Sequence, residues 1–197
     1  MINAIQIIQR EHRGISSVLH CLDSVVRDID TRGTNPDFEL LHTIIDYICS
    51  FLFRFHHPKE DLYLFHALRR RCPDSLALLD QLEEEHRIGD QLVEDCRQAL
   101  YTYERIGETA FHAFKEAVDA YCSLEETHMM KEEREVIPRA RECLTQQDWS
   151  EIEAAFTDHE DPLFGENTTE RFEKLFYTIA KLCPLPHGSE VSESWHP

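Results

Sequence analysis

Two segments of the chain carry a histidine that is followed four residues later by a glutamate. The pairs are His56 with Glu60 and His128 with Glu132, and a second acidic residue follows each glutamate directly. Residues four apart lie on one face of a helix, so each pair can approach a single point. Imidazole nitrogens and carboxylate oxygens together suit iron or manganese. The spacing therefore favours metal-binding chemistry.

A second repeated motif supplies two further histidines. Glu-His-Arg occurs around His12 and again around His86, so the chain reads EHR, HxxKE, EHR, HxxKE. The interval from His12 to His56 nearly equals that from His86 to His128, which indicates a repeated helical hairpin. A near-constant interval places each histidine at a similar height on an antiparallel neighbour.

Each motif alone has a structural explanation. A single His–Glu pair at this spacing is usually a surface pair that stabilises a helix by about 0.2–0.5 kcal/mol, and a Glu-His-Arg run is usually a solvated face. Together, four buried histidines and two buried carboxylates would be unfavourable without an ion. The combination predicts a site for two ions in the core, with Glu60 and Glu132 bridging them.

Long helices must position these residues. Glycine is scarce, with 6 residues, and long stretches show apolar spacing near 3.6. We expect helices at about 4–30, 36–70, 76–105 and 108–141, the second begun by Asn35 and Pro36 and kinked or loosened at Pro58. Long helices with short connections pack as antiparallel neighbours. The fold class predicted is all-α, an up-down-up-down four-helix bundle.

A helical extension is expected after the bundle. Thr145 and Asp148 resemble a cap before a short helix that ends near residue 157, and Asn167 or Thr168 could begin a last helix that ends near Cys183. We therefore expect a bundle at 1–143, an extension at 144–183 and a flexible tail at 184–197. The extension either covers one end of the bundle or makes a homodimer contact.

Composition excludes several classes of partner. The net charge is −18, from 38 acidic and 20 basic residues, and an acidic surface repels nucleic acid and anionic membranes. No stretch is apolar enough for a membrane span or a signal peptide. The seven cysteines are spread without any C-x-x-C pair, which favours reduced thiols in a cytoplasmic protein.

The ordered motifs resemble the hemerythrin-like, or HHE cation-binding, family over about residues 1–143. Residues 55–61 (FHHPKED) are similar to its helix-two signature, and residues 128–133 (HMMKEE) to its helix-four signature. The resemblance implies a non-haem diiron centre, with two iron ions joined by an oxo or hydroxo bridge, that binds dioxygen, nitric oxide or peroxide. It also implies a ligand set in which one iron is held by His12 and His56, the other by His86 and His128, with Glu60 and Glu132 bridging.

The third helix departs from the pattern of the oxygen-carrying hemerythrins, which have two histidines four apart there. Leu82 and Asp90 stand four residues before and after His86, so one iron lacks a histidine. His57 can replace it, because one step along a helix turns a side chain by about 100° toward the other ion. The repeat counterpart of His57 is Met129. His57 is therefore either a ligand or a hydrogen-bonding neighbour of the ligands.

Three functions stay open at this stage. The first is binding or sensing of dioxygen or nitric oxide, including in a stress response. The second is a diiron enzyme, such as an oxidase, a peroxidase, a nitric oxide reductase or a repair factor for iron centres, and the third is an iron reservoir. The other histidines lack the paired arrangement and are expected mostly at the surface: His20, His42, His66, His112, His159, His187 and His196.

Overall fold

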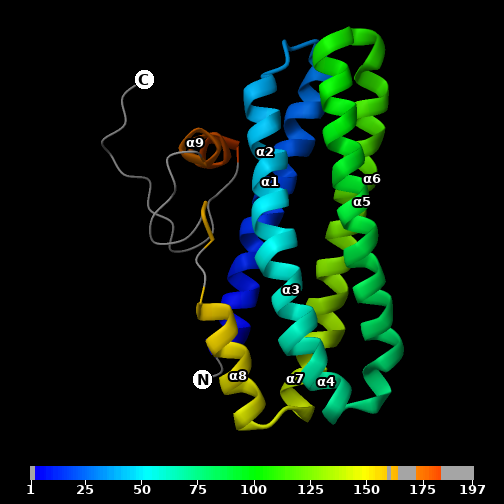
Figure 1. Ribbon diagram of the computed structural model, residues 1–197. Helices are drawn as coiled ribbons and strands as arrows, with labels where there is room; N and C mark the ends of the chain where they lie inside the picture. Colours follow the sequence, from blue (N-terminus) through cyan, green and yellow to red (C-terminus); the bar gives the residue numbers. More distant parts are fainter. Residues whose placement is uncertain (1–2, 159–160, 164–171, 183–197) are drawn as a thin grey trace.

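The prediction of an all-α fold is confirmed. The computed structural model describes residues 3–158, 161–163 and 172–182, and every regular element in these ranges is helical (Figure 1). The α-helices are α1 (Asn3–Arg32), α2 (Phe38–Phe51), α3 (His57–Lys59), α4 (His66–Arg71), α5 (Leu76–Ile106), α6 (Phe111–Lys131), α7 (Ile137–Cys143), α8 (Gln146–Thr157) and α9 (Glu173–Leu182). Short 3-10 turns, η3 (Pro73–Ser75) and η4 (Glu108–Ala110), precede α5 and α6.

Wider π-helical turns interrupt the second and fourth helical stretches. They are η1 (Leu52–His56), η2 (Glu60–Phe65) and η5 (Glu132–Val136). Pro58 lies in the short α3 between two of them, so the loosening expected at this proline takes the form of wider turns in a helix that continues. Turns of this kind are frequent at functional sites, and these three begin or end at predicted metal ligands.

The predicted start of the second helix is wrong by two residues. Asp37 is the N-cap in place of Asn35, and its Oδ1 accepts a hydrogen bond from the backbone nitrogen of Leu40 at 3.0 Å. This bond pairs one of the backbone donors that a helix start leaves free. The cap predicted at Thr145 is confirmed, since Thr145 and Asp148 form a reciprocal capping box before α8.

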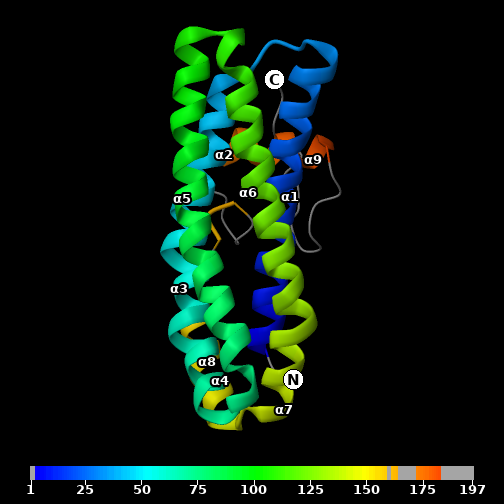
Figure 2. The same ribbon diagram turned by 90° about the vertical axis from the view of Figure 1, so that its right-hand side faces the viewer.

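The four long stretches lie side by side (Figures 1 and 2). Contacts join α1 to α2, α2 to α5, α5 to α6, and α6 back to α1, while α8 packs on α1 and α9 contacts α1 and α2. Gly107, at φ 85°, ends α5 and turns the chain toward α6. Part of the predicted last helix, and all of the predicted tail, lie outside the described residues.

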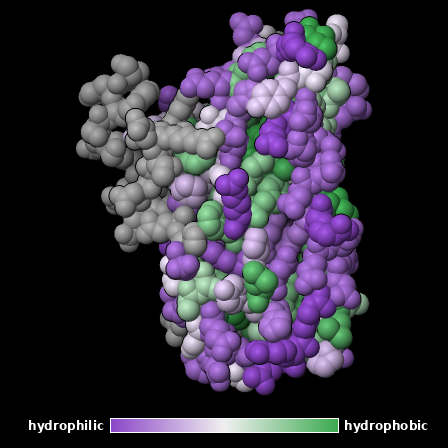
Figure 3. Space-filling model, viewed as in Figure 1, coloured by the Kyte–Doolittle hydropathy of each residue, from purple (hydrophilic) through white to green (hydrophobic). Residues whose placement is uncertain are grey.

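The face of the molecule shown in Figure 3 is largely hydrophilic, as the net charge leads one to expect. On this face, apolar residues show mainly between the helices. No described helix combines the length and apolar character that a membrane crossing needs. No disulfide bond joins two of the described cysteines.

Two apolar clusters fill the interior, and a polar layer separates them. On α1, the cluster near the N-terminus contains Ile5 and Ile8, whereas the other begins at Ile15. The remaining three stretches divide in the same way, and the buried charged or polar residues at the division are histidines, glutamates and Lys59. The fold therefore places a band of ionisable groups at one height, closed off by apolar packing above and below.

Candidate metal centre

The four long stretches each contribute a histidine to the polar layer. His12 lies on α1, His56 on η1, His86 on α5 and His128 on α6, and their exposed fractions are 4%, 1%, 5% and 2%. Burial at this level makes a charged or unpaired group unfavourable unless a partner compensates it. Their common height follows from the repeated hairpin that the sequence predicts.

One group of ligand atoms, which we call the first subsite, consists of His12, His56 and Glu60. Glu60 Oε1 lies 3.4 Å from His12 Nε2 and 3.5 Å from His56 Nε2. Glu132 Oε2 lies 3.3 Å from the same nitrogen of His12. Two imidazole nitrogens and two carboxylate oxygens thus surround one point.

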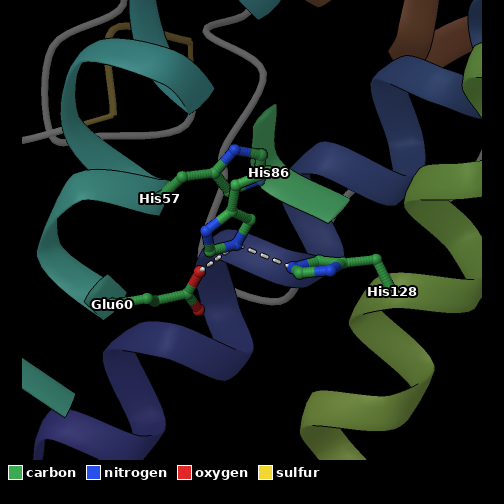
Figure 4. A group of neighbouring side chains, drawn as sticks. All are labelled: His57, Glu60, His86 and His128. Atoms are coloured by element: carbon green, nitrogen blue, oxygen red, sulfur yellow. Dashed lines mark hydrogen bonds and ion pairs between the residues drawn. The ribbon is translucent and has the colours of Figure 1, made fainter. Parts of the chain in front are cut away.

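The second subsite consists of His57, Glu60, His86 and His128, and Figure 4 shows these side chains converging from three helical stretches. His86 Nε2 lies 2.9 Å from His128 Nε2 and 3.7 Å from Glu60 Oε2. The ring of His57 stacks on that of His86, with centroids 4.1 Å apart and planes inclined by 14°. The structure therefore brings His57 to the subsite that lacks a second histidine from α5.

The two glutamates lie between the subsites. Glu60 turns Oε1 to the first subsite and Oε2 to the second. Glu132 does the reverse, because its Oε2 lies near His12 while its Oε1 lies 3.3 Å from His128 Nε2. A carboxylate with one oxygen on each side can bridge two cations. All seven residues predicted as ligands are thus brought together in one layer.

A ring of outer carboxylates surrounds the histidines, and the sequence reasoning missed its role. Glu11, Asp61, Glu85 and Glu133 each accept a hydrogen bond from the Nδ1 of a histidine on a neighbouring helical stretch. The N···O distances are 2.7 Å for His56 to Glu11, 2.9 Å for His86 to Asp61, 3.2 Å for His128 to Glu85 and 2.9 Å for His12 to Glu133. Such a bond keeps the proton on Nδ1 and leaves Nε2 for a metal ion.

The signal for this ring was present in the repeat. Glu11 and Glu85 directly precede a histidine ligand, and Asp61 and Glu133 directly follow a glutamate ligand. Adjacent residues on a helix point about 100° apart, so a neighbour of a ligand faces the next stretch. An acidic residue at all four of these positions therefore predicts a carboxylate partner for His12, His56, His86 and His128.

The charges in the layer attract positive charge. Burial lowers the pKa of His128, but the charge of Glu132 and hydrogen bonds to carboxylates outweigh burial and raise it to about 11. The hydrogen bond from His128 is the largest cause that lowers the pKa of Glu85 to about 2. By contrast, burial lowers the pKa of His56 to about 3 and raises that of Glu11 to about 7. The raised pKa of His128 shows that the carboxylates around it favour a positive charge, and a bound cation would supply one.

Several buried ligand atoms have no hydrogen-bond partner among the described residues. These atoms are His12 Nε2, His56 Nε2, His57 Nδ1 and both carboxylate oxygens of Glu60 and Glu132. A buried polar atom without a partner costs about 1–3 kcal/mol, so this cluster is unfavourable in isolation. Neutral nitrogens mixed with anionic oxygens, without thiolates, suit iron or manganese. The residues present therefore fit a pair of such ions.

The remaining predicted groups lie elsewhere. His20, His66 and His112 are exposed and His42 is half-buried, as expected, while His159, His187 and His196 lie outside the described residues. A cavity of about 470 Å³ opens between α1 and α6, and its lining includes His12, Met129 and Glu133. Of the first subsite, His12 is among the residues that line this cavity.

Comparison with known proteins gives one match. The profile of the family described as Hemerythrin HHE cation binding domain matches residues 3–140. That range contains every residue of both subsites and of the outer ring. No curated protein matches the chain, and no solved structure does.

Proposed function

Because the chain belongs to the hemerythrin HHE cation-binding domain family, we propose that it is a non-haem diiron protein that binds dioxygen or nitric oxide. The observation that carries this proposal is the pair of subsites that share Glu60, together with Glu132, whose two carboxylate oxygens lie 3.3 Å from His12 Nε2 and from His128 Nε2. His12 and His56 would hold one iron, and His57, His86 and His128 the other. When bound, two iron ions supply the redox chemistry and the open position that such a ligand needs.

The two apolar clusters keep bulk water away from the polar layer. The side chains next to the layer are fully buried, with exposed fractions of 0%: Val136 and Phe65 on one side, Leu52 and Phe51 on the other. A dry, low-dielectric setting strengthens the attraction between the carboxylates and a cation. It also favours a small uncharged ligand over a hydrated anion.

The first subsite is where the small ligand would approach. It gathers two histidines, whereas the second gathers three, so the first has fewer protein ligands. The cavity between α1 and α6 is lined by His12 of this subsite and by Met129. We therefore propose that a diatomic ligand enters beside Met129.

We also propose that the fold is the up-down-up-down four-helix bundle of this family. On this interpretation, α2 to α4 form one helix and α6 to α7 form another, each widened by π turns. Two observations support it: Leu52 and Glu132 keep right-handed helical backbone angles where α2 and α6 pass into π turns, and the four stretches contact one another in a closed ring.

Reconstitution under anaerobic conditions tests the proposal. Ferrous iron would be added to the apoprotein, bound iron counted, and visible absorption followed on exposure to dioxygen and then to nitric oxide, with the Glu60→Ala variant as the control. We expect two irons per chain and an absorption band that disappears when the gas is removed. Steady consumption of dioxygen or peroxide would instead identify an enzyme. Failure to retain two irons would contradict the diiron proposal.

A further inference from the structure

One buried carboxylate next to the second subsite has no role in the proposed site. Glu125 lies on α6, three residues before His128, and is 2% exposed. Its Oε2 lies 3.7 Å from Nε2 of His57, yet it has no hydrogen-bond partner among the described residues. A buried carboxylate is unfavourable unless a charged or hydrogen-bonding group compensates it, and His57 is the ion-pair partner that the structure gives it.

The contact to His57 uses a different nitrogen from the other four contacts. His12, His56, His86 and His128 meet their outer carboxylates through Nδ1. His57 meets Glu125 through Nε2, and its Nδ1 is buried without a hydrogen-bond partner in the described part of the chain. The free nitrogen of His57 is therefore Nδ1, the opposite of the arrangement at the other histidines.

A glycine on the neighbouring helix provides the space for this carboxylate. Gly89 lies within α5, and a Cβ atom built at this position would be 2.9 Å from Glu125 Oε1. A glycine inside a helix lowers its stability, so its presence here favours a packing reason. The carboxylate of Glu125 occupies the space that any larger residue would take.

The first hairpin of the repeat lacks this arrangement. Three residues before His56, at the place that Glu125 has relative to His128, the chain has Phe53, whose ring packs against His57 at 5.6 Å. The counterpart of His57 is Met129. The additional histidine and the additional carboxylate thus occur together, on one side of the layer only.

We propose that Glu125 is the positioning residue for His57, the fifth member of the carboxylate ring, and that it holds the imidazole with the proton on Nε2 so that Nδ1 can bind the second ion. This inference rests on the proposed function, because it assigns a ligand role to His57. It explains how the second subsite obtains a third histidine without the helix-three histidine of the oxygen carriers.

Titration of the apoprotein with cobalt(II) tests the proposal, because bound cobalt is counted and its visible spectrum reports each ion. Wild type, Glu125→Ala, Glu125→Gln and the control Glu116→Ala, an exposed residue of the same helix, would be compared. We expect Glu125→Ala and Glu125→Gln to weaken one of two cobalt ions by about 10–100-fold and to leave the other within about twofold. Unchanged affinity for both ions would overturn the inference. Failure of the wild type to bind two ions would instead overturn the proposed function.

A double-mutant cycle shows whether Glu125 acts through His57. If it does, His57→Ala with Glu125→Ala binds the affected ion no more weakly than His57→Ala alone. If the double variant lost affinity by the product of the two single losses, Glu125 would act independently of His57, which would contradict a positioning role. Gly89→Ala, which crowds the same carboxylate, is expected to give a smaller loss at the same ion.

Nuclear magnetic resonance of the zinc-loaded protein, labelled with ¹⁵N-histidine, shows which ring nitrogen of each histidine carries the proton. We expect His57 to carry its proton on Nε2 and the other four histidines to carry theirs on Nδ1. A merely structural Glu125 would not set this pattern. A proton on Nδ1 of His57 would overturn the inference.

Discussion

The two subsites take their paired histidines from the two hairpins of one repeat, yet they are not equal. Each has two histidines backed by carboxylates, His12 and His56 in the first and His86 and His128 in the second. The second adds His57, whereas the repeat places Met129 at the corresponding position. On the proposed function, the repeat would determine where the two ions lie. One exchange, histidine against methionine, would then determine which ion has an open position.

The largest effect is expected where the subsites are joined. Glu60 belongs to both groups of ligand atoms, so Glu60→Ala should remove both ions, with an affinity loss of more than about 100-fold at each, because the remaining ligands lose a shared anion. Metal analysis after dialysis against iron measures this, with the exposed Glu84→Ala as the control. A variant that kept one ion at wild-type affinity would show that Glu60 serves a single subsite.

Glu11 and Glu85 occupy equivalent positions in the two hairpins. Replacing each of them is expected to weaken the binding of a different ion. Glu11→Gln removes the carboxylate partner of His56, and Glu85→Gln removes that of His128. Each should weaken one ion by about 10–100-fold and spare the other. Cobalt titration of the two variants and of their combination checks this. If both variants weakened the same ion, the division into two subsites would be wrong.

Adding a histidine to the first subsite, to match the second, is expected to fill the open position at its ion. Met129→His places an imidazole at the counterpart of His57, beside the cavity that reaches His12. We expect the first ion to bind roughly tenfold more tightly, because it gains a nitrogen ligand, and the affinity for nitric oxide to fall by at least a similar factor. Met129→Leu, which keeps the volume, is the control. Unchanged nitric oxide binding by Met129→His would contradict entry at the first subsite.

The smallest effect on metal binding is expected from a substitution outside both subsites, at Asp148 in the first turn of α8. Burial raises the pKa of Asp148, but hydrogen bonds from Thr145 and Arg71 outweigh it and hold the pKa well below its usual range. Its stabilisation is therefore complete above the unfolded pKa of about 3.9 and is lost as the pH falls toward the folded value.

Asp148→Asn should accordingly lower the free energy of unfolding by about 1–2 kcal/mol at pH 7. The difference from wild type should shrink below about pH 4. Urea unfolding of the apoprotein at several pH values measures this, and iron binding serves as the control because it should not change. A difference in the free energy of unfolding that grew toward low pH would contradict a lowered pKa of Asp148.

Sequence alone predicted much of the layer because its ligands follow helical spacing. His56 and Glu60, like His128 and Glu132, are fixed by the four-residue period within one helix, and the repeat relates one pair to the other. Asp37 as the cap of α2 was missed because Asn35 and Pro36 carry an equally good capping signal. The choice between them depends on where the helix packs, which local spacing does not contain.

Glu125 was missed for a different reason. Its importance depends on contacts across helices, to His57 and to the space over Gly89, and it breaks the repeat instead of following it. A search for repeated residues finds what the two hairpins share. What makes the subsites unequal appears only when the helices are packed together.

Mössbauer spectroscopy of the protein reconstituted with ⁵⁷Fe(II) under anaerobic conditions is the sharpest test of two unequal iron sites, because it distinguishes iron environments. We expect two irons per chain and two distinct signals of equal area, one for each subsite. One iron per chain, or none, would contradict the diiron centre, and a single signal from two irons would contradict the inequality of the subsites.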